Sequence, residues 1–206
     1  MRVNKTSNRD FQFDILMANP PFAGDIKESR ILSKYELSKN AAGKLAGKVG
    51  RDILFIERNL DFLKPGGRMA IVLPQGRFNN SSDKYIRDYI AERCRILAVV
   101  GLHGNVFKPH TGTKTSVLFV QKWDDVLCPK KEDYPIFFAT MQEPSKDNSG
   151  EKIFVKKGDY PRVIKPTEEQ DKWMVSDVVA HYEVTPKENN EYLLDSHGHL
   201  IVKHDL

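Results

Sequence analysis

The first apolar run of the chain, Phe13-Asp14-Ile15-Leu16-Met17-Ala18, leads directly into the tetrapeptide Asn19-Pro20-Pro21-Phe22. A short run that ends at two prolines predicts a buried strand followed by a rigid turn. In an open α/β sheet, ligands bind beyond the carboxyl ends of the strands. The tetrapeptide is therefore a candidate functional element.

Each residue of the tetrapeptide has a plausible role in methylation of an exocyclic amine, whose lone pair is delocalised into the ring. The side-chain oxygen of Asn19 and the main-chain carbonyl of Pro20 can accept the two N–H groups, which frees the lone pair. Pro20 and Pro21 fix φ and hold both acceptors in place. The ring of Phe22 can stack on an extruded base. The alternative is a simple turn, since Asn-Pro favours turns, but the preceding strand favours the functional interpretation.

The pattern after residue 50 alternates between helices and strands. Residues 53, 56, 60 and 63 are apolar at helical spacing, and this predicts a helix from Arg51 that stops before Pro65. A second helix is expected from Asp83. Residues 68–73, 96–100 and 116–120 are expected to be strands. This order predicts an α/β protein with a mostly parallel sheet and one antiparallel strand near the edge.

The alternation of helical and strand patterns weakens after Trp123. We therefore expect a catalytic domain over 1–125 and an extension over 126–206. Residues 135–139 and 152–155 are candidates for a pair of strands. Thr167 and Gln170 resemble a capping box that opens a helix reaching about residue 180.

The composition is that of an ordinary globular protein: 206 residues, 40% hydrophobic and 29% charged, with a net charge of +4. This excludes collagen-like, disordered and disulfide-framework classes. Cys94 and Cys128 show no metal-ligand spacing, so no metal site is indicated. No apolar stretch is long enough to span a bilayer, and we expect a cytoplasmic protein without a membrane partner.

The segment 23–50 shows no sustained periodicity and has a net charge of +3. Its basic side chains can attract nucleic-acid phosphate, although a solvated surface is an equally ordinary explanation. The candidate DNA-binding residues here are Lys27, Lys34, Lys39, Lys44 and Lys48.

Four further blocks accompany the tetrapeptide, and with them the chain resembles a known family, the modification (methylation) subunits of type I restriction–modification systems. The blocks are Phe62-Leu63-Lys64-Pro65-Gly66-Gly67-Arg68, Ile71-Val72-Leu73-Pro74-Gln75-Gly76, Asn105-Val106-Phe107 and Thr111-Gly112-Thr113-Lys114-Thr115-Ser116-Val117-Leu118-Phe119. The resemblance is close over 11–123 and faint to about 180.

The resemblance implies a DNA adenine-N6 methyltransferase with a partial Rossmann-like sheet, from the fourth strand onward. S-adenosylmethionine would be the methyl donor. Double-stranded DNA and the specificity and restriction subunits of the same system would be the partners. The catalytic residues would be Asn19, Pro20, Pro21 and Phe22, and Asn19 would also lie at the methyl donor.

Each of the remaining candidate site residues has two possible interpretations. By analogy with the family, Phe107 would stack on the second face of the base, but a core position is as plausible. Lys114 can approach DNA phosphate or lie in a solvated turn. Gln75 and Arg77 follow a strand end, so they can reach the cleft or belong to a turn.

One feature of the family does not appear in this sequence. Relatives have a glycine-rich cofactor loop upstream of the tetrapeptide, whereas only 18 residues precede Asn19 here. We therefore expect the C-terminal part of a longer enzyme, which alone would be inactive and would bind S-adenosylmethionine weakly or not at all. The alternatives are methylation of guanine N2 in RNA or of a protein glutamine, and a non-catalytic remnant that docks DNA or a specificity subunit.

Overall fold

A computed structural model describes residues 12–40, 42–156, 199–200 and 202. By its contacts the chain divides into two compact units, residues 1–104 with 111–141 and residues 105–110 with 142–206. The predicted division near residue 125 stays a prediction. The regular elements discussed below belong to the first unit.

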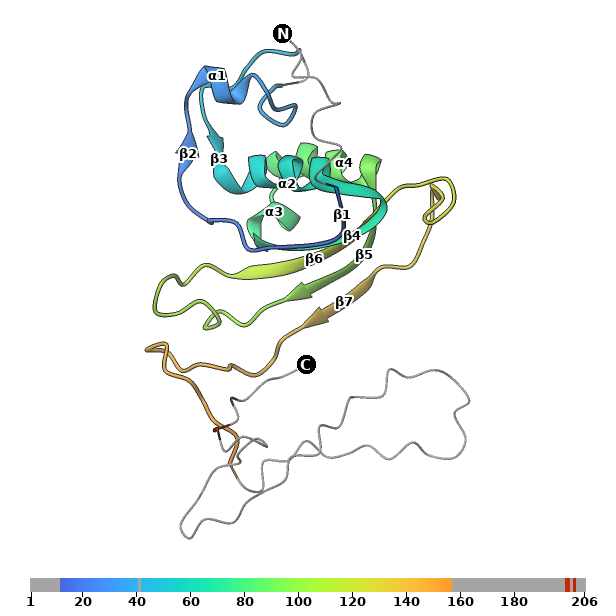
Figure 1. Cartoon of the computed structure of the whole chain (residues 1–206). Helices are drawn as coiled ribbons and strands as arrows, with labels where there is room; N and C mark the ends of the chain where they lie inside the picture. Colours follow the sequence, from blue (N-terminus) through green and yellow to red (C-terminus); the bar gives the residue numbers. More distant parts are fainter. Residues whose placement is uncertain (1–11, 41, 157–198, 201, 203–206) are drawn as a thin grey trace, which may run out of the picture. The chain divides into compact units, whose positions relative to one another are not determined.

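Five strands form one sheet, in the order β1-β4-β6-β5-β7 (Figure 1). They are β1 (Phe13–Ala18), β4 (Leu63–Pro74), β6 (Thr115–Lys122), β5 (Cys94–Gly101) and β7 (Phe137–Thr140). Only β6 runs against the other four strands of this sheet. The α/β class and the strands near 13–18, 68–73, 96–100 and 116–120 are confirmed, although β4 begins five residues before its predicted start.

The expected position of the antiparallel strand is wrong, because β6 lies in the middle of the sheet and not near its edge. The crossover from β4 to β5 leaves a gap of one strand between them. The chain then turns back after β5, and β6 fills that gap with antiparallel pairs on both sides.

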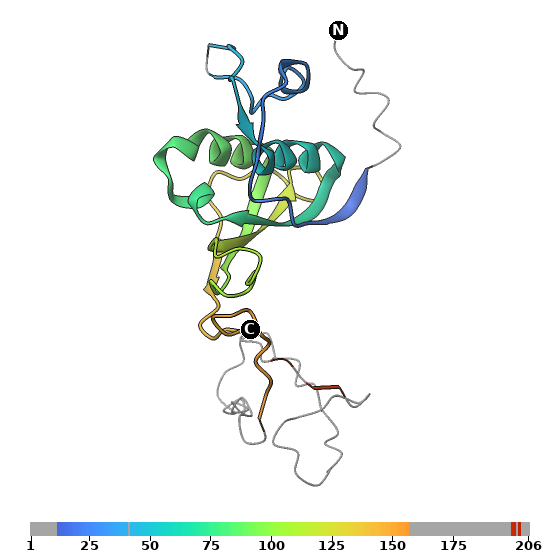
Figure 2. The ribbon, with the colours of Figure 1, turned by 90° about the vertical axis from the view of Figure 1, so that its left-hand side faces the viewer.

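Two helices, α2 (Arg51–Phe62) and α4 (Lys84–Arg93), pack on one face of the sheet (Figures 1 and 2). The apolar residues that predicted α2 are buried beneath it, except that Leu63 begins β4. The short α3 (Gly76–Asn79) and the 3-10 turn η2 (Ser81–Asp83) connect β4 to α4.

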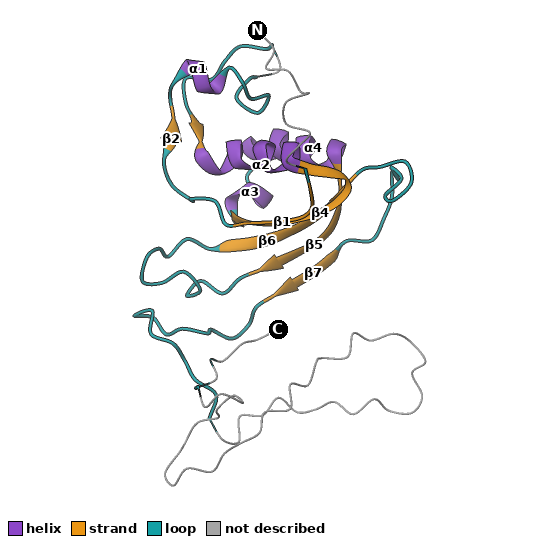
Figure 3. Ribbon diagram, in the orientation of Figure 1, coloured by secondary structure: helices purple, strands orange, loops and turns teal. Residues whose placement is uncertain are grey.

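The two faces of the sheet differ in burial. Met69, Ile71 and Leu73 of β4 point to the helix-covered face and are at most 2% exposed. The intervening Ala70 and Val72 lie on the opposite side, which we call the open face, and are half-buried. On β1, Ile15 and Met17 lie on the open face and are 73% and 81% exposed. No helix in the described part of the chain covers this face (Figure 3).

The segment 23–50 has no sequence periodicity, and short elements were not expected in it. These are β2 (Asp25–Ile26), α1 (Ser29–Leu32) and β3 (Val49–Gly50), and β2 pairs with β3 in antiparallel fashion. Their pairing is long-range, and a two-residue strand has no period to detect. Glu57 of α2 fastens the segment, because its carboxylate accepts the backbone N–H groups of Glu36 and Leu37 at 2.8 Å each.

The predicted pairing of residues 135–139 with 152–155 is wrong. β7 instead pairs in parallel with β5, whose second edge is free to accept a strand. Residues 152 and 154 form only isolated bridges, to Lys146 and Val202. The helix predicted from Thr167 lies outside the described residues. Among the described helices, none has the length and apolar character needed to cross a membrane.

Candidate active site

The tetrapeptide lies at the edge of the sheet where β1 and β4 end. Ala18, the last residue of β1, pairs with Ile71 in the parallel β1–β4 ladder. β4 ends at Pro74, and the next residue, Gln75, donates its N–H to the carbonyl of Lys114 at 2.9 Å. The motif, Gln75 and Lys114 therefore lie along one edge of the sheet, where α/β proteins bind ligands.

The four motif residues differ in exposure. Asn19 and Pro21 are exposed, Phe22 is half-buried and Pro20 is buried. The buried proline fixes the local backbone, while the neighbouring amide side chain stays accessible. This arrangement presents a hydrogen-bond acceptor to a ligand from a rigid support.

The chain after the motif is attached to the start of α2. Gly24 has φ +95°, and its carbonyl accepts the N–H of Arg51 at 3.0 Å. A side chain at Gly24 would meet the Arg51 guanidinium, since a Cβ atom there would lie 3.2 Å from Cζ. The β2–β3 pairing continues this attachment, because Asp25 pairs with Gly50.

A partly buried ionic cluster, Asp52–Arg77–Asp83, lies beside this attachment, and the sequence did not reveal it. Arg77 donates through Nε and Nη2 to the two carboxylate oxygens of Asp52, at 2.7 and 3.1 Å, and through Nη1 to Asp83 at 2.9 Å. Burial lowers the pKa of Arg77, but the two carboxylates outweigh it and leave that pKa raised. The position of Arg77 after a strand end predicted a cleft or turn residue, and no spacing rule identifies its partners.

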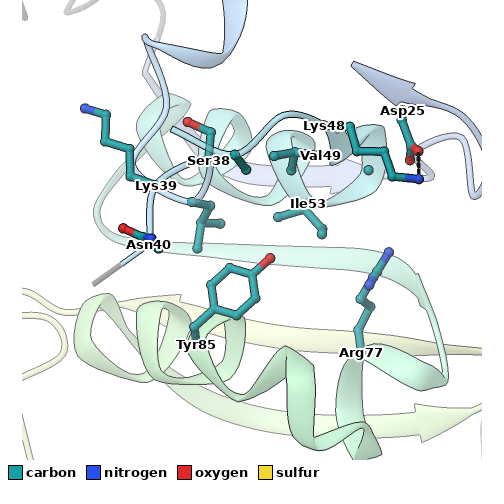
Figure 4. A pocket seen from close by; sticks show the side chains of 12 residues that line it. Asp25, Ser38, Lys39, Asn40, Lys48, Val49, Ile53, Arg77 and Tyr85 are labelled. Atoms are coloured by element: carbon teal, nitrogen blue, oxygen red, sulfur yellow. Dashed lines mark ion pairs between the residues drawn. The ribbon is translucent and has the colours of Figure 1, made fainter. Parts of the chain in front are cut away.

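Arg77 and Tyr85 line a hollow of about 530 Å³ between the segment 23–50 and the helices (Figure 4). Its floor includes the buried side chains Val49 and Ile53. At its rim Lys48 forms an ion pair with Asp25, with 3.1 Å between Nζ and Oδ2. Burial raises the pKa of Tyr85. The hollow is mainly apolar at its floor and charged at its rim.

The candidate DNA-binding lysines are exposed in the structure. Five lie on the segment 23–50, and Lys114 lies at the same sheet edge as the motif; the six are Lys27, Lys34, Lys39, Lys44, Lys48 and Lys114. Phe107 is half-buried and belongs to the second unit, so its pairing with Phe22 stays a prediction.

Within the described residues, no glycine-rich loop for S-adenosylmethionine follows a strand. No two glycines of the chain have the Gly-x-Gly spacing of a dinucleotide-type loop. The hollow beside Arg77 and a smaller one near Tyr35, of about 200 Å³, are lined by residues outside the motif. The structure therefore presents Asn19 as an accessible amide side chain where β1 ends, and the role of Asn19 toward a methyl donor stays a prediction.

The chain is similar to known proteins over most of its length. The model of the N-6 DNA methylase family matches residues 3–203. The chain is 32% identical over 117 residues to the type I restriction enzyme EcoEI methylase subunit of Escherichia coli, which covers 56% of this chain and 22% of that subunit. It is also 25% identical over 122 residues to the type II restriction enzyme and methyltransferase RM.Eco57I of E. coli, over 58% of this chain and 12% of that protein.

Solved structures share the fold. A Listeria monocytogenes protein described as a class I S-adenosylmethionine-dependent methyltransferase matches with a TM-score of 0.51 and 24% identity, over 63% of this chain and 36% of that one. A chain of a type I restriction–modification system matches with a TM-score of 0.53 and 21% identity, over 71% of this chain and 28% of that one. The chain thus spans about a fifth or less of the length of the two curated relatives.

Proposed function

The chain belongs to the N-6 DNA methylase family, and we propose that it forms the part of a DNA adenine-N6 methyltransferase that holds the target amine, within the modification subunit of a type I restriction–modification system. The observation that carries this proposal is the exposed Asn19 at the carboxyl end of β1, next to the buried Pro20. We expect S-adenosylmethionine to supply the methyl group.

The chemistry proposed for this chain concerns the adenine N6 atom. Its lone pair is delocalised into the ring, so the amine is a weak nucleophile. The Asn19 side-chain oxygen and the Pro20 carbonyl accept the two N6–H groups, which favours a more tetrahedral nitrogen with a localised lone pair. The rigid backbone holds both acceptors before the base arrives, so little order is lost on binding. Phe22 and Phe107 would stack on the extruded base.

The exposed lysines would supply the attraction to DNA. Such contacts act on phosphate without regard to sequence, so binding should weaken steeply as salt rises. The partners that we propose are double-stranded DNA and the specificity and restriction subunits of the same system, in the cytoplasm. The support for them is the likeness to a methylase subunit of a type I restriction enzyme.

A chimera tests the proposal. The matched 117-residue segment of the E. coli EcoEI methylase subunit is replaced by the corresponding residues of this chain, and N6-methyladenine in DNA is measured by mass spectrometry. We expect methylation that Asn19→Ala abolishes, with a fall of about 100-fold or more. Asn19→Asp, which keeps an acceptor oxygen, should retain measurable transfer.

Equal methylation in the chimera and its Asn19→Ala variant would contradict the proposed role of the motif. The same samples distinguish the alternative substrates. Methylated guanine N2 in RNA, or methylated glutamine in protein, without N6-methyladenine would replace the DNA assignment.

A further inference from the structure

The ionic cluster Asp52–Arg77–Asp83 joins three separate elements. Asp52 lies in the first turn of α2, Arg77 in α3 and Asp83 in η2. The Asp52 and Asp83 side chains are 2% and 10% exposed, and that of Arg77 is 24% exposed. One guanidinium against two carboxylates leaves one net negative charge. Replacing such a cluster by apolar residues is often neutral for stability, whereas removing one partner leaves the other charge unpaired and is destabilising. The role of the cluster is therefore judged from the elements that it holds together.

Gly50 makes room for the cluster. A Cβ atom at this position would lie 2.8 Å from Oδ1 of Asp52 and 3.3 Å from Nη2 of Arg77. The backbone of Gly50, with φ −58° and ψ 141°, suits any residue. A side chain at position 50 would therefore displace the Asp52 carboxylate, although the backbone itself accepts any residue.

The cluster connects by short contacts to both loops at the sheet edge. On one side, Gly50 pairs with Asp25, and Arg51 donates its N–H to Gly24, two residues after Phe22. On the other side, Arg77 is two residues after Gln75, whose N–H is bound to Lys114. The bidentate pair with Asp52 thus fixes the start of α2, and the motif loop attached to it, against the loop that follows β4.

We propose that Arg77 is a positioning residue, which holds the loop of the Asn19–Phe22 motif in register with the loop after β4 through Asp52. The geometry favours arginine, because its planar fork binds both oxygens of Asp52 and still reaches Asp83. Lysine keeps the charge, but its donors share a single nitrogen and cannot reproduce the planar contact that Nε and Nη2 make with Asp52. The inference rests on the proposed function only in one respect, namely that the motif is the element that holds the target amine.

Hydrogen–deuterium exchange of the full chain tests the positioning directly, without DNA or methyl donor. Three variants disturb the cluster: Arg77→Lys, Asp52→Asn and Gly50→Ala. In each we expect the amide of Arg51, which is bonded to the Gly24 carbonyl, and the amides of the paired residues 25–26 and 49–50 to exchange about tenfold faster or more. The reason is that local opening no longer has to break the bidentate pair. The unfolding midpoint in urea, measured in parallel, separates this local effect from global unfolding.

Two variants serve as matched controls. Gly47→Ala adds the same methyl group in the same segment, where no atom lies within 4 Å of the new Cβ, and should leave exchange unchanged. Lys122→Met removes the bonds from Nζ to the carbonyls of Leu60 and Leu63, at the other end of α2. It should loosen that end and leave the exchange of residues 25–26 and 49–51 unchanged.

The outcomes are distinct. Unchanged exchange of residues 25–26 and 49–51 in Arg77→Lys and Gly50→Ala would overturn the inference. Faster exchange spread evenly over the whole first unit would also overturn it. If the loop is loosened but the chimera transfers no methyl group to DNA, the positioning stands and the proposed function fails.

Discussion

The two faces of the sheet are built from neighbouring residues of the same strands, yet they have different surroundings. On the helix-covered face, Ile71 and Val120 are fully buried beneath α2 and α4. On the open face, Val72 is half-buried and Met17 is 81% exposed. Sheets with mainly parallel strands are usually covered on both faces.

The difference in burial shows which face of the sheet is packed by the described residues and which is not. The helix-covered face forms a closed core within the described residues, and the segment 23–50 is tied to it through Leu32 and Leu37. The open face and the free edge of β1 present apolar side chains that the described residues do not pack against. Burial, and not residue type, therefore determines what a substitution on each face should cost.

The largest expected difference concerns adjacent residues of β4. Ile71→Ala should lower the free energy of unfolding by about 2–5 kcal/mol, because it leaves a cavity in a core position that is 0% exposed. Val72→Ala, on the open face, should lower it by about 1 kcal/mol or less. Urea unfolding followed by circular dichroism measures both. Similar losses for the two variants would mean that the open face is covered in solution.

A smaller effect is expected on self-association through β1. The exposed apolar side chains and free edge of this strand predict that the chain associates with itself at high concentration. Replacing Ile15 and Met17 by lysine should weaken that association several-fold, as measured by analytical ultracentrifugation. Val126→Lys changes a side chain that is 84% exposed elsewhere and should have no such effect. A wild-type chain that stays monomeric at high concentration would refute this prediction.

The smallest expected effect is the pH dependence of stability that comes from Glu57 of α2, the helix on the covered face. Burial raises the pKa of Glu57 above its ordinary value of 4.5, although the N–H groups of Glu36 and Leu37 oppose the shift. Between 4.5 and the raised pKa the folded state binds more protons than the unfolded one, so the contribution of Glu57 to stability falls as pH rises through this window.

The variant Glu57→Gln, which has no ionisable group at this position, isolates the contribution of the Glu57 carboxyl to stability. The difference in unfolding free energy, wild type minus variant, should decrease from pH 4.5 upward and become constant above the raised pKa. Urea titrations at a series of pH values measure it, and a difference that increases with pH would show that the hydrogen bonds outweigh burial.

Much of the fold could be predicted because its signals are local. The apolar run 13–18 gives β1, and Ile53, Ile56 and Leu60 repeat at the helical period of α2. The prolines at 20 and 21 mark the end of β1 and draw attention to Asn19. The motif could be recognised for the same reason, since its four residues are contiguous.

The features that were missed depend on residues far apart in the chain. Asp52 and Arg77 are 25 positions apart, and Glu57 binds backbone groups 20 and 21 positions away. The short β2 and β3 form only because they pair with each other. No periodicity or short motif records such contacts.

The sequence by itself determined the α/β class, the main helices and strands, and the motif at the end of β1, because periodicity and proline act over a few residues. Only the tertiary structure decided that β6 inserts between β4 and β5, that β7 joins β5, and that one face of the sheet is covered. It also brought Arg77 between two carboxylates beside the motif loop. These outcomes depend on which distant surfaces meet, and that choice is made by packing and strand pairing across the whole unit.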